Sequence, residues 1–280
     1  MAKNSLRDKV LPVLKRLPTL SAGTGRLLSA LSKRDIEAGK LSAIVQDDPM
    51  LAVNVLQLAN SGVFGRLRRI ESIKHAVSLL GPYTLRRYAL GWTFTNIWRK
   101  LQDLPRWSTS KFTMHSEATA LLADILCDYV PVGSSDGAFI AGLVHDIGKF
   151  VICSEAAAHL DFIMSVRELG QQSPTEVERN VLGIDHAEIS SMAAANWGLN
   201  DDICHAIHCH HEPHLDATGA ELNLSFILHK ADRFVNGLGL GYLSSGADAS
   251  TEFDLPGYET QVKEALAAFE EAWKASGVLV

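Results

Sequence analysis

Helix start and stop signals recur along the chain, and they constrain its fold more than any other feature. Residues 48–49 (DP) pair an N-cap aspartate with a proline at the first helical position, ahead of an apolar stretch. Ser72 precedes a similar stretch that stops at Gly81, residues 173–176 (SPTE) form a capping box, and Asp185 precedes a further stretch. Because alternating apolar and polar runs bounded by turns are nearly lacking, we predict an all-α fold with more than ten helices.

The histidines are distributed unevenly: of eleven, only His75 precedes residue 108. We therefore predict an N-terminal helical subdomain over residues 1–107 and a metal-binding helical subdomain over residues 108–236. Residues 237–280 are expected to form a Gly- and Ser-rich loop, as far as residue 256, and then an amphipathic C-terminal helix. Its apolar stripe predicts core packing, with partner binding as the alternative, and consists of Val262, Leu266, Phe269 and Trp273.

Composition limits the classes of function. Residues 1–8 lack the apolar core of a signal peptide, and no long uncharged apolar run predicts a membrane span, so we expect a soluble cytoplasmic protein. The four cysteines are scattered without a C-x-x-C pair, which is typical of reduced thiols. A net charge of −6 argues against nucleic acid as a partner, and the basic residues at 66–69 and 86–87 are interpreted as solvated helix ends.

The segment AGLVHDIGK, at residues 141–149, carries the strongest chemical signal. His145 offers a nitrogen donor and Asp146 a charged oxygen donor at adjacent positions, which we expect inside one apolar helix. An uncompensated buried carboxylate is costly, so Asp146 needs a cation or strong hydrogen-bond partners there. Taken alone, Lys149 is interpreted as a positive charge that the helix dipole favours near a C-terminus.

Further donors follow on successive predicted helices. His115 lies on a helix expected over residues 109–129, and His186 lies in the first turn of the helix after the capping box. His210 and His211 end a helix that begins near Asn200, and Asp232 falls in an apolar segment. One donor per helix, facing inward, is how helical folds build dinuclear centres.

The types of donor limit the metal. Mixed histidine and aspartate ligands suit iron, manganese, zinc or nickel better than calcium. A single helical histidine is more often a packed or surface residue, and we interpret His205, His208, His214 and His229 in that way. Packing does not readily explain this whole set of spaced donors, so the sequence predicts a divalent transition-metal centre.

The order of these donors resembles the HD metal-dependent phosphohydrolase superfamily and its dinuclear branch, which includes the HD-GYP cyclic-di-GMP phosphodiesterases. The resemblance implies a first metal held by His115, His145, Asp146 and Asp232. It implies that Asp146 also bridges to a second metal, which is held by His186 and His210, with His211 as a further ligand. In an active enzyme of this kind Lys149 would contact substrate phosphate, and Lys149 and Asp146 would be the catalytic residues.

Other segments resemble the signature of HDOD proteins, which are regarded as non-catalytic signalling modules related to HD-GYP. They are LPTL at 17–20, IVQDDPMLA at 44–52, VLQLANS at 55–61, IESIKHAVSLLG at 70–81 and WGL at 197–199. The resemblance covers residues 10 to 235 and implies an HD-type helical bundle with an N-terminal helical layer. No Gly-Tyr-Pro follows residues 210–212, so the chain departs from the HD-GYP pattern.

The resemblance leaves two functions open. The first is a bacterial regulatory protein that binds protein partners in signalling and has a structural or sensory metal site. The alternative is an active phosphohydrolase that acts on a phosphate-containing small molecule through the same metals. An open metal face with a phosphate-sized cleft would favour catalysis, whereas a centre covered by the N-terminal helices would favour regulation.

Overall fold

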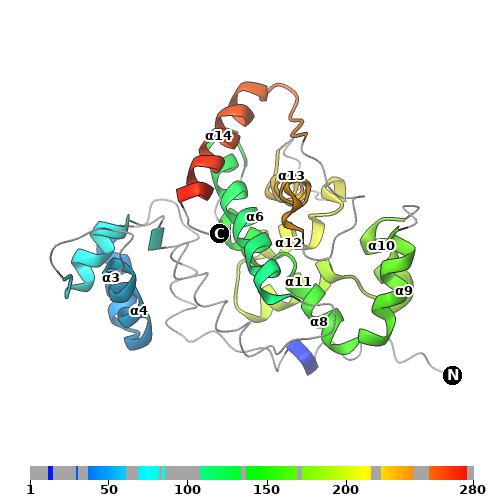
Figure 1. Ribbon diagram of the computed structural model, residues 1–280, viewed down its shortest axis with the longest axis horizontal. Helices are drawn as coiled ribbons and strands as arrows, with labels where there is room; N and C mark the ends of the chain where they lie inside the picture. The colour runs from blue at the N-terminus through cyan, green and yellow to red at the C-terminus, as the bar shows by residue number, and fades with distance from the viewer. Residues whose placement is uncertain are drawn as a thin grey trace. The chain divides into compact units, whose positions relative to one another are not determined.

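The computed structural model describes residues 12–14, 30, 37–60, 69–81, 84–85, 108–133, 137–168, 172–215, 222–241 and 252–275 (Figure 1). Regular structure in these ranges is entirely helical, which confirms the predicted all-α fold and its more than ten helices. The predicted motif at residues 17–20 and the basic residues 66–68 and 86–87 lie outside the described ranges. The chain forms two compact units, one over residues 18–100 and one that combines residues 1–17 with 101–280.

In the first unit, α3 (Ala38–Gln46), α4 (Pro49–Ala59) and a helix over residues 73–81 form a common apolar core. Asp48 caps α4 as predicted, because its side chain accepts hydrogen bonds from the backbone N–H groups of Met50 and Leu51. Apolar residues spaced by four positions turn one face of each helix inward. The core residues are Leu41, Val45, Leu51, Val55, Ala59, Ile70, Ala76, Val77, Leu80 and Leu85.

In the second unit, α6 (Thr109–Tyr129) is the longest helix among the described residues, and its sequence explains its position. Thirteen of its residues are buried, so it is apolar on most of its circumference and suits the interior. It packs against α7 (Ala138–Val144), α13 (Leu224–Val235) and α14 (Glu259–Ala275). Val262, Phe269 and Trp273 of α14 are buried and Leu266 is half-buried, so three of the four stripe residues pack into the core as predicted.

The remaining helices of this unit surround the same core. The predicted capping box at residues 173–176 begins α10 (Pro174–Leu182), which lies beside α9 (Ala157–Glu168) (Figure 1). As predicted, Asp185 caps α11 (His186–Asn196), and α11 packs on α8 (Ile147–Glu155) and α12 (Asp201–Cys209). No helix in the described ranges is long and apolar enough to cross a membrane.

Two local predictions were wrong. Residues 145–146 were expected inside one helix, but α7 ends at Val144 and α8 starts at Ile147. Asp146 has φ −108° and ψ 8°, outside the helical region. This break matters because the side chains of adjacent residues in a continuous helix, such as 145 and 146, would point in different directions. A loop was expected from residue 237, yet a helical turn, η3 (Asn236–Leu240), follows α13 directly. The turn is kinked at Gly239, whose φ of 78° is not helical and suits a glycine.

Candidate metal centre

Seven predicted ligands converge in the second unit, from five different parts of the chain. His115 lies on α6, Asp232 on α13, and His145 and Asp146 at the junction of α7 and α8. His186 is the first residue of α11, and His210 and His211 follow the last residue of α12. The structure gathers them into two donor groups that share Asp146.

The first donor group consists of His115, His145, Asp146 and Asp232. Nε2 of His115 lies 3.1 Å from Oδ1 of Asp232, 3.4 Å from Nε2 of His145 and 3.6 Å from Oδ2 of Asp146. Nε2 of His145 lies 3.4 Å from both of these carboxylate oxygens. Ligand atoms at about 2.0–2.2 Å from one ion are roughly 2.8–3.6 Å apart at octahedral or tetrahedral angles, so these spacings fit a single cation.

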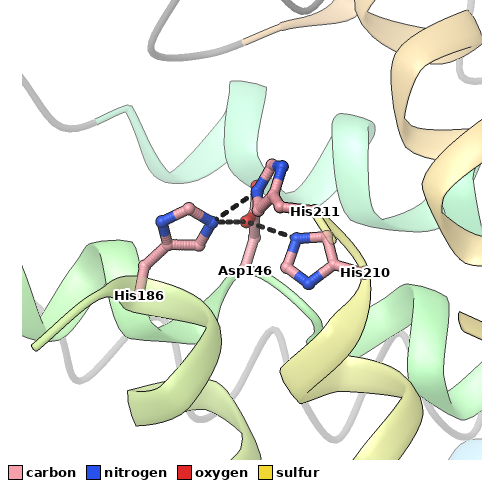
Figure 2. A group of neighbouring side chains, drawn as sticks. All are labelled: Asp146, His186, His210 and His211. Atoms are coloured by element: carbon pink, nitrogen blue, oxygen red, sulfur yellow. Dashed lines mark hydrogen bonds and ion pairs between the residues drawn. The ribbon is translucent and has the colours of Figure 1, made fainter. Parts of the chain in front are cut away.

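The second donor group consists of Asp146, His186, His210 and His211. Figure 2 shows the rings of His186 and His210 directed at the Asp146 carboxylate, with distances of 3.3 and 3.9 Å from Nε2 to Oδ1. Nε2 of His211 lies 2.8 Å from Nε2 of His186. The two oxygens of Asp146 therefore face different groups, Oδ2 the first and Oδ1 the second, as a bridging carboxylate requires.

Three histidine rings hydrogen-bond a protein acceptor through Nδ1, the ring nitrogen that points away from the centre. These bonds determine the protonation of Nε2, the nitrogen that points towards the centre. Nδ1 of His145 donates to the Gly142 carbonyl at 2.8 Å, and Nδ1 of His210 donates to the Ile207 carbonyl at 2.6 Å. Nδ1 of His186 donates to the Glu178 carboxylate at 2.6 Å. In the neutral form of each ring, Nε2 then keeps a lone pair that faces the centre, the arrangement found in metal-ligating histidines.

The electrostatics of the first group call for a positive charge. Burial alone would lower the pKa of His145, but the carboxylates of Asp146 and Asp232 raise it to about 10. Burial opposes ionisation of both carboxylates, yet their positively charged and hydrogen-bonding neighbours hold each pKa well below its usual range. A proton on His145 and a bound cation are two ways to satisfy the same buried negative charge.

The second group favours neutral imidazoles. Burial and the positive charge of neighbouring histidines lower the pKa of His210 and of His211 well below the ordinary value. Nε2 of His210 is buried and has no hydrogen-bond partner within the described part of the chain. A buried lone pair that faces a carboxylate and two other imidazoles fits a metal ligand, so the residues present suit divalent cations in both groups.

Lys149 lies beside the centre on the first turn of α8, so the interpretation of its charge as one near a helix C-terminus was wrong. Its Nζ lies 2.6 Å from Oδ2 of Asp146, and its side chain is 11% exposed. In this structure the lysine therefore contacts a predicted ligand, whereas its contact with substrate phosphate stays a prediction.

Sequence reasoning missed the residues that support the ligands. Glu178 binds His186, and Asn236 donates its amide to Oδ1 of Asp232 at 2.9 Å. The hydroxyl of Ser190 accepts from the N–H of Gly148 and donates to the carbonyl of His186, which ties α8 to α11. No local signal identifies these positions, because Glu178 stands between charged residues on α10 and the fold alone turns it inward.

The histidines that we assigned to packing or the surface lie apart from the two donor groups. His205, His208 and His214 are exposed. His229 is half-buried, and its Nδ1 donates to the backbone carbonyl of His210 at 2.7 Å. His229 therefore supports the segment that carries His210.

Comparison with solved structures places this fold among known ones. An HDOD domain protein of unknown function from Geobacter sulfurreducens matches at 20% identity with a TM-score of 0.69, over 97% of each chain. A protein provisionally named for signal transduction, from Marinobacter aquaeolei VT8, matches at 23% identity and a TM-score of 0.69, over 99% of this chain and 62% of its own. A provisionally named phosphohydrolase from Shewanella amazonensis SB2B matches at 20% identity with a TM-score of 0.66, over 97% of this chain and 98% of its own. At these identities the likeness concerns the fold alone.

Sequence comparison defines the family. An uncharacterised protein of Treponema pallidum (strain Nichols) is 25% identical over 209 residues, which make up 71% of this chain and 38% of that protein. The chain thus spans well under half the length of this relative. The HDOD domain matches residues 17–213, most of the chain. These residues, with the helical fold and the buried His/Asp cluster, show that the chain belongs to the HDOD domain family.

Proposed function

We propose that this HDOD protein is a bacterial signalling regulator that acts through protein partners, and that its His/Asp centre holds two divalent transition-metal ions in a structural or sensory role. The observation that carries the proposal is that six of the seven ligands are buried. The ligand side chains of the first group are 0–2% exposed and those of His186 and His210 are 0% exposed, while His211 is half-buried. Ions held mainly by buried side chains are suited to stabilising one conformation.

The metals would act as cross-links. In the first group an ion would join α6, the α7–α8 junction and α13, and in the second it would join that junction to α11 and α12. Each bound ion supplies positive charge among buried carboxylates and imidazoles. Since ions that bind only the folded state stabilise it by mass action, the conformation of the unit would depend on metal supply.

The donor types support the identity of the metals. The first group offers two imidazoles and two carboxylates, and the second offers three imidazoles and the shared carboxylate. Imidazole ligands suit zinc, iron and nickel, and added carboxylate extends the range to manganese. We therefore propose iron, manganese, zinc or nickel in a dinuclear centre.

Phosphohydrolysis is the alternative, and the completeness of the ligand set is the observation that favours it. Two structural features favour regulation instead. Six of the seven ligands are buried, and Lys149, which would contact substrate phosphate, pairs with Asp146. The sequence also lacks the Gly-Tyr-Pro of HD-GYP enzymes after Glu212.

Metal analysis combined with hydrolysis assays tests the proposal. Protein purified without chelator should carry about one to two transition-metal ions per chain by elemental analysis. The metal-loaded protein and its Asp146→Asn variant should show the same background rate with p-nitrophenyl phosphate, bis(p-nitrophenyl) phosphate and cyclic-di-GMP. Enzyme-like turnover that Asp146→Asn abolishes would establish the phosphohydrolase alternative. A metal-free protein whose stability ignores added ions would refute the metal centre itself.

A further inference from the structure

Glu178 lies on α10, a helix that contributes no residue to either donor group. Its side chain is 4% exposed, and its Oε2 atom accepts two hydrogen bonds from one residue. The backbone N–H of His186 donates at 2.8 Å and the ring Nδ1 of His186 donates at 2.6 Å. One carboxylate oxygen thus fixes both the main chain and the side chain of a predicted ligand.

This contact determines how His186 faces the second donor group. Because a carboxylate oxygen only accepts, the proton of the neutral ring lies on Nδ1 and the lone pair on Nε2. That Nε2 lies 3.3 Å from Oδ1 of Asp146 and 2.8 Å from Nε2 of His211. Glu178 therefore selects the tautomer and the ring orientation that a metal needs.

Charge gives a second reason to connect Glu178 with this group. The first group contains two carboxylates, Asp146 and Asp232, whereas the second contains only the shared Asp146 beside three imidazoles. A carboxylate that accepts a hydrogen bond from Nδ1 of an imidazole makes its Nε2 a stronger metal donor. Glu178 supplies that charge to the group with fewer carboxylates of its own.

The neighbouring residue on α10 supports the same group from the outside. Nε of Arg179 lies 3.3 Å from Asp185, which precedes His186, and its two terminal nitrogens contact Glu212, which follows His211, at 2.6 and 3.2 Å. α10 therefore holds both segments that deliver histidines to the second group.

We propose that Glu178 is a positioning residue for the ion of the second donor group, and that its charge and its hydrogen bond to His186 set the affinity for that ion without affecting the first. This inference rests on the proposed function, because it requires that the centre bind metal. It assigns Glu178 no contact with the ion.

Three variants separate charge, geometry and general stability. Glu178→Gln keeps the acceptor oxygen and the size but removes the charge, whereas Glu178→Met removes both charge and hydrogen bond. Glu176→Gln is the matched control, since Glu176 is an exposed acid on the same helix and glutamine also serves in a capping box.

Chelator-stripped protein would be titrated with Zn²⁺ against a chromophoric competitor, which gives one affinity per ion. His186→Ala identifies the affinity that belongs to the second group. We expect Glu178→Gln to lower the affinity for that ion about tenfold and Glu178→Met to lower it about a hundredfold. This is the range for residues that hydrogen-bond to metal-binding histidines. The first affinity should remain parental in both variants, and Glu176→Gln should match the parent at both sites.

The tautomer of His186 is a second measurement, and it would not change if Glu178 only stabilised the fold. ¹⁵N-histidine NMR of the metal-free protein should show Nδ1–H at His186 in the parent, and a mixture of tautomers in Glu178→Met. A parent that never binds a second ion would refute the dinuclear proposal and this inference together. A parent with two ions whose Glu178→Gln and Glu178→Met variants keep both parental affinities, or lose both equally, would refute this inference alone.

Discussion

The ammonium group of Lys149 lies 2.6 Å from Oδ2 of Asp146, the oxygen that also faces His115 and His145. The pair is local, because Lys149 follows Asp146 by three residues on the first turn of α8. It places a fixed positive charge at the oxygen where the first ion would bind. Lys149 therefore stabilises the metal-free centre and repels the cation that would replace it.

Replacing Lys149 with methionine should separate these two effects. Breaking a buried ion pair leaves a buried charge behind, so the free energy of unfolding of the chelated protein should fall by about 3–5 kcal/mol. The affinity for the first ion should rise, since the cation no longer meets a like charge. Urea denaturation with chelator and with Zn²⁺ would measure both. Lys111→Met, at an exposed position on α6, is the control and should change neither value.

Asp146→Asn tests the bridging role. The substitution preserves shape and volume but removes the charge that two ions would share, so elemental analysis should show both ions lost together. His186→Ala should empty only the second group. Thermal melts with and without chelator should follow occupancy, with the largest chelator effect in the parent. If parent and Asp146→Asn melt at the same temperature in either buffer, Asp146 does not bridge.

Much of this centre could be predicted because donor identity and helix boundaries are local properties. The expected helix over residues 109–129 matches α6, and the caps at Asp48, Ser173 and Asp185 lie where the residue types indicate. A polar cap and an apolar stripe need only neighbours within one or two turns. The spacing of the donors could then be interpreted one helix at a time.

What could not be predicted depends on contacts between distant segments. The break at residues 145–146 follows an apolar run with no proline, so nothing local marks it. Glu178 and Asn236 resemble solvated helix residues until the fold places them against His186 and Asp232. Lys149 could have faced solvent or a ligand, and only the structure shows its contact with Asp146.

As the pH rises, the stability of the metal-free protein should fall, and the extra stability that bound metal confers should grow. In the metal-free protein the pKa of His145 is raised from 6.5 to about 10 by Asp146 and Asp232, against the effect of burial. Because the folded protein binds this proton more tightly than the unfolded chain, its contribution to stability is full below about pH 6.5 and is lost as the pH rises towards 10. An ion at Nε2 must displace that proton, so metal affinity should rise over the same range.

Urea melts across this range would check the prediction. Chelated protein should lose stability between about pH 6.5 and 10, while Zn²⁺-bound protein should gain relative to it. His145→Gln should abolish both trends, because no titrating ring remains at that position. A chelated parent whose stability does not change over this range would contradict the charge assignment.

Gly148 tests whether the centre requires close approach of α8 to α11. A Cβ atom at Gly148 would overlap the backbone carbonyl of His186, and backbone on both sides leaves little room to adjust. Gly148→Ala should therefore push α8 away from α11, break the Ser190 hydrogen bond to the Gly148 N–H, and displace His186 from Asp146. Overpacking of this kind costs about 1–3 kcal/mol, and loss of the second ion should add to it.

Gly39→Ala on α3 is the matched control, since nothing lies within 4 Å of its added Cβ and alanine favours helix. Thermal melts should show that Gly148→Ala is less stable than the parent, and metal analysis should show that it has lost the second ion. Gly39→Ala should be at least as stable as the parent. If Gly148→Ala keeps both ions at parental affinity, the approach of α8 to α11 does not control the second donor group.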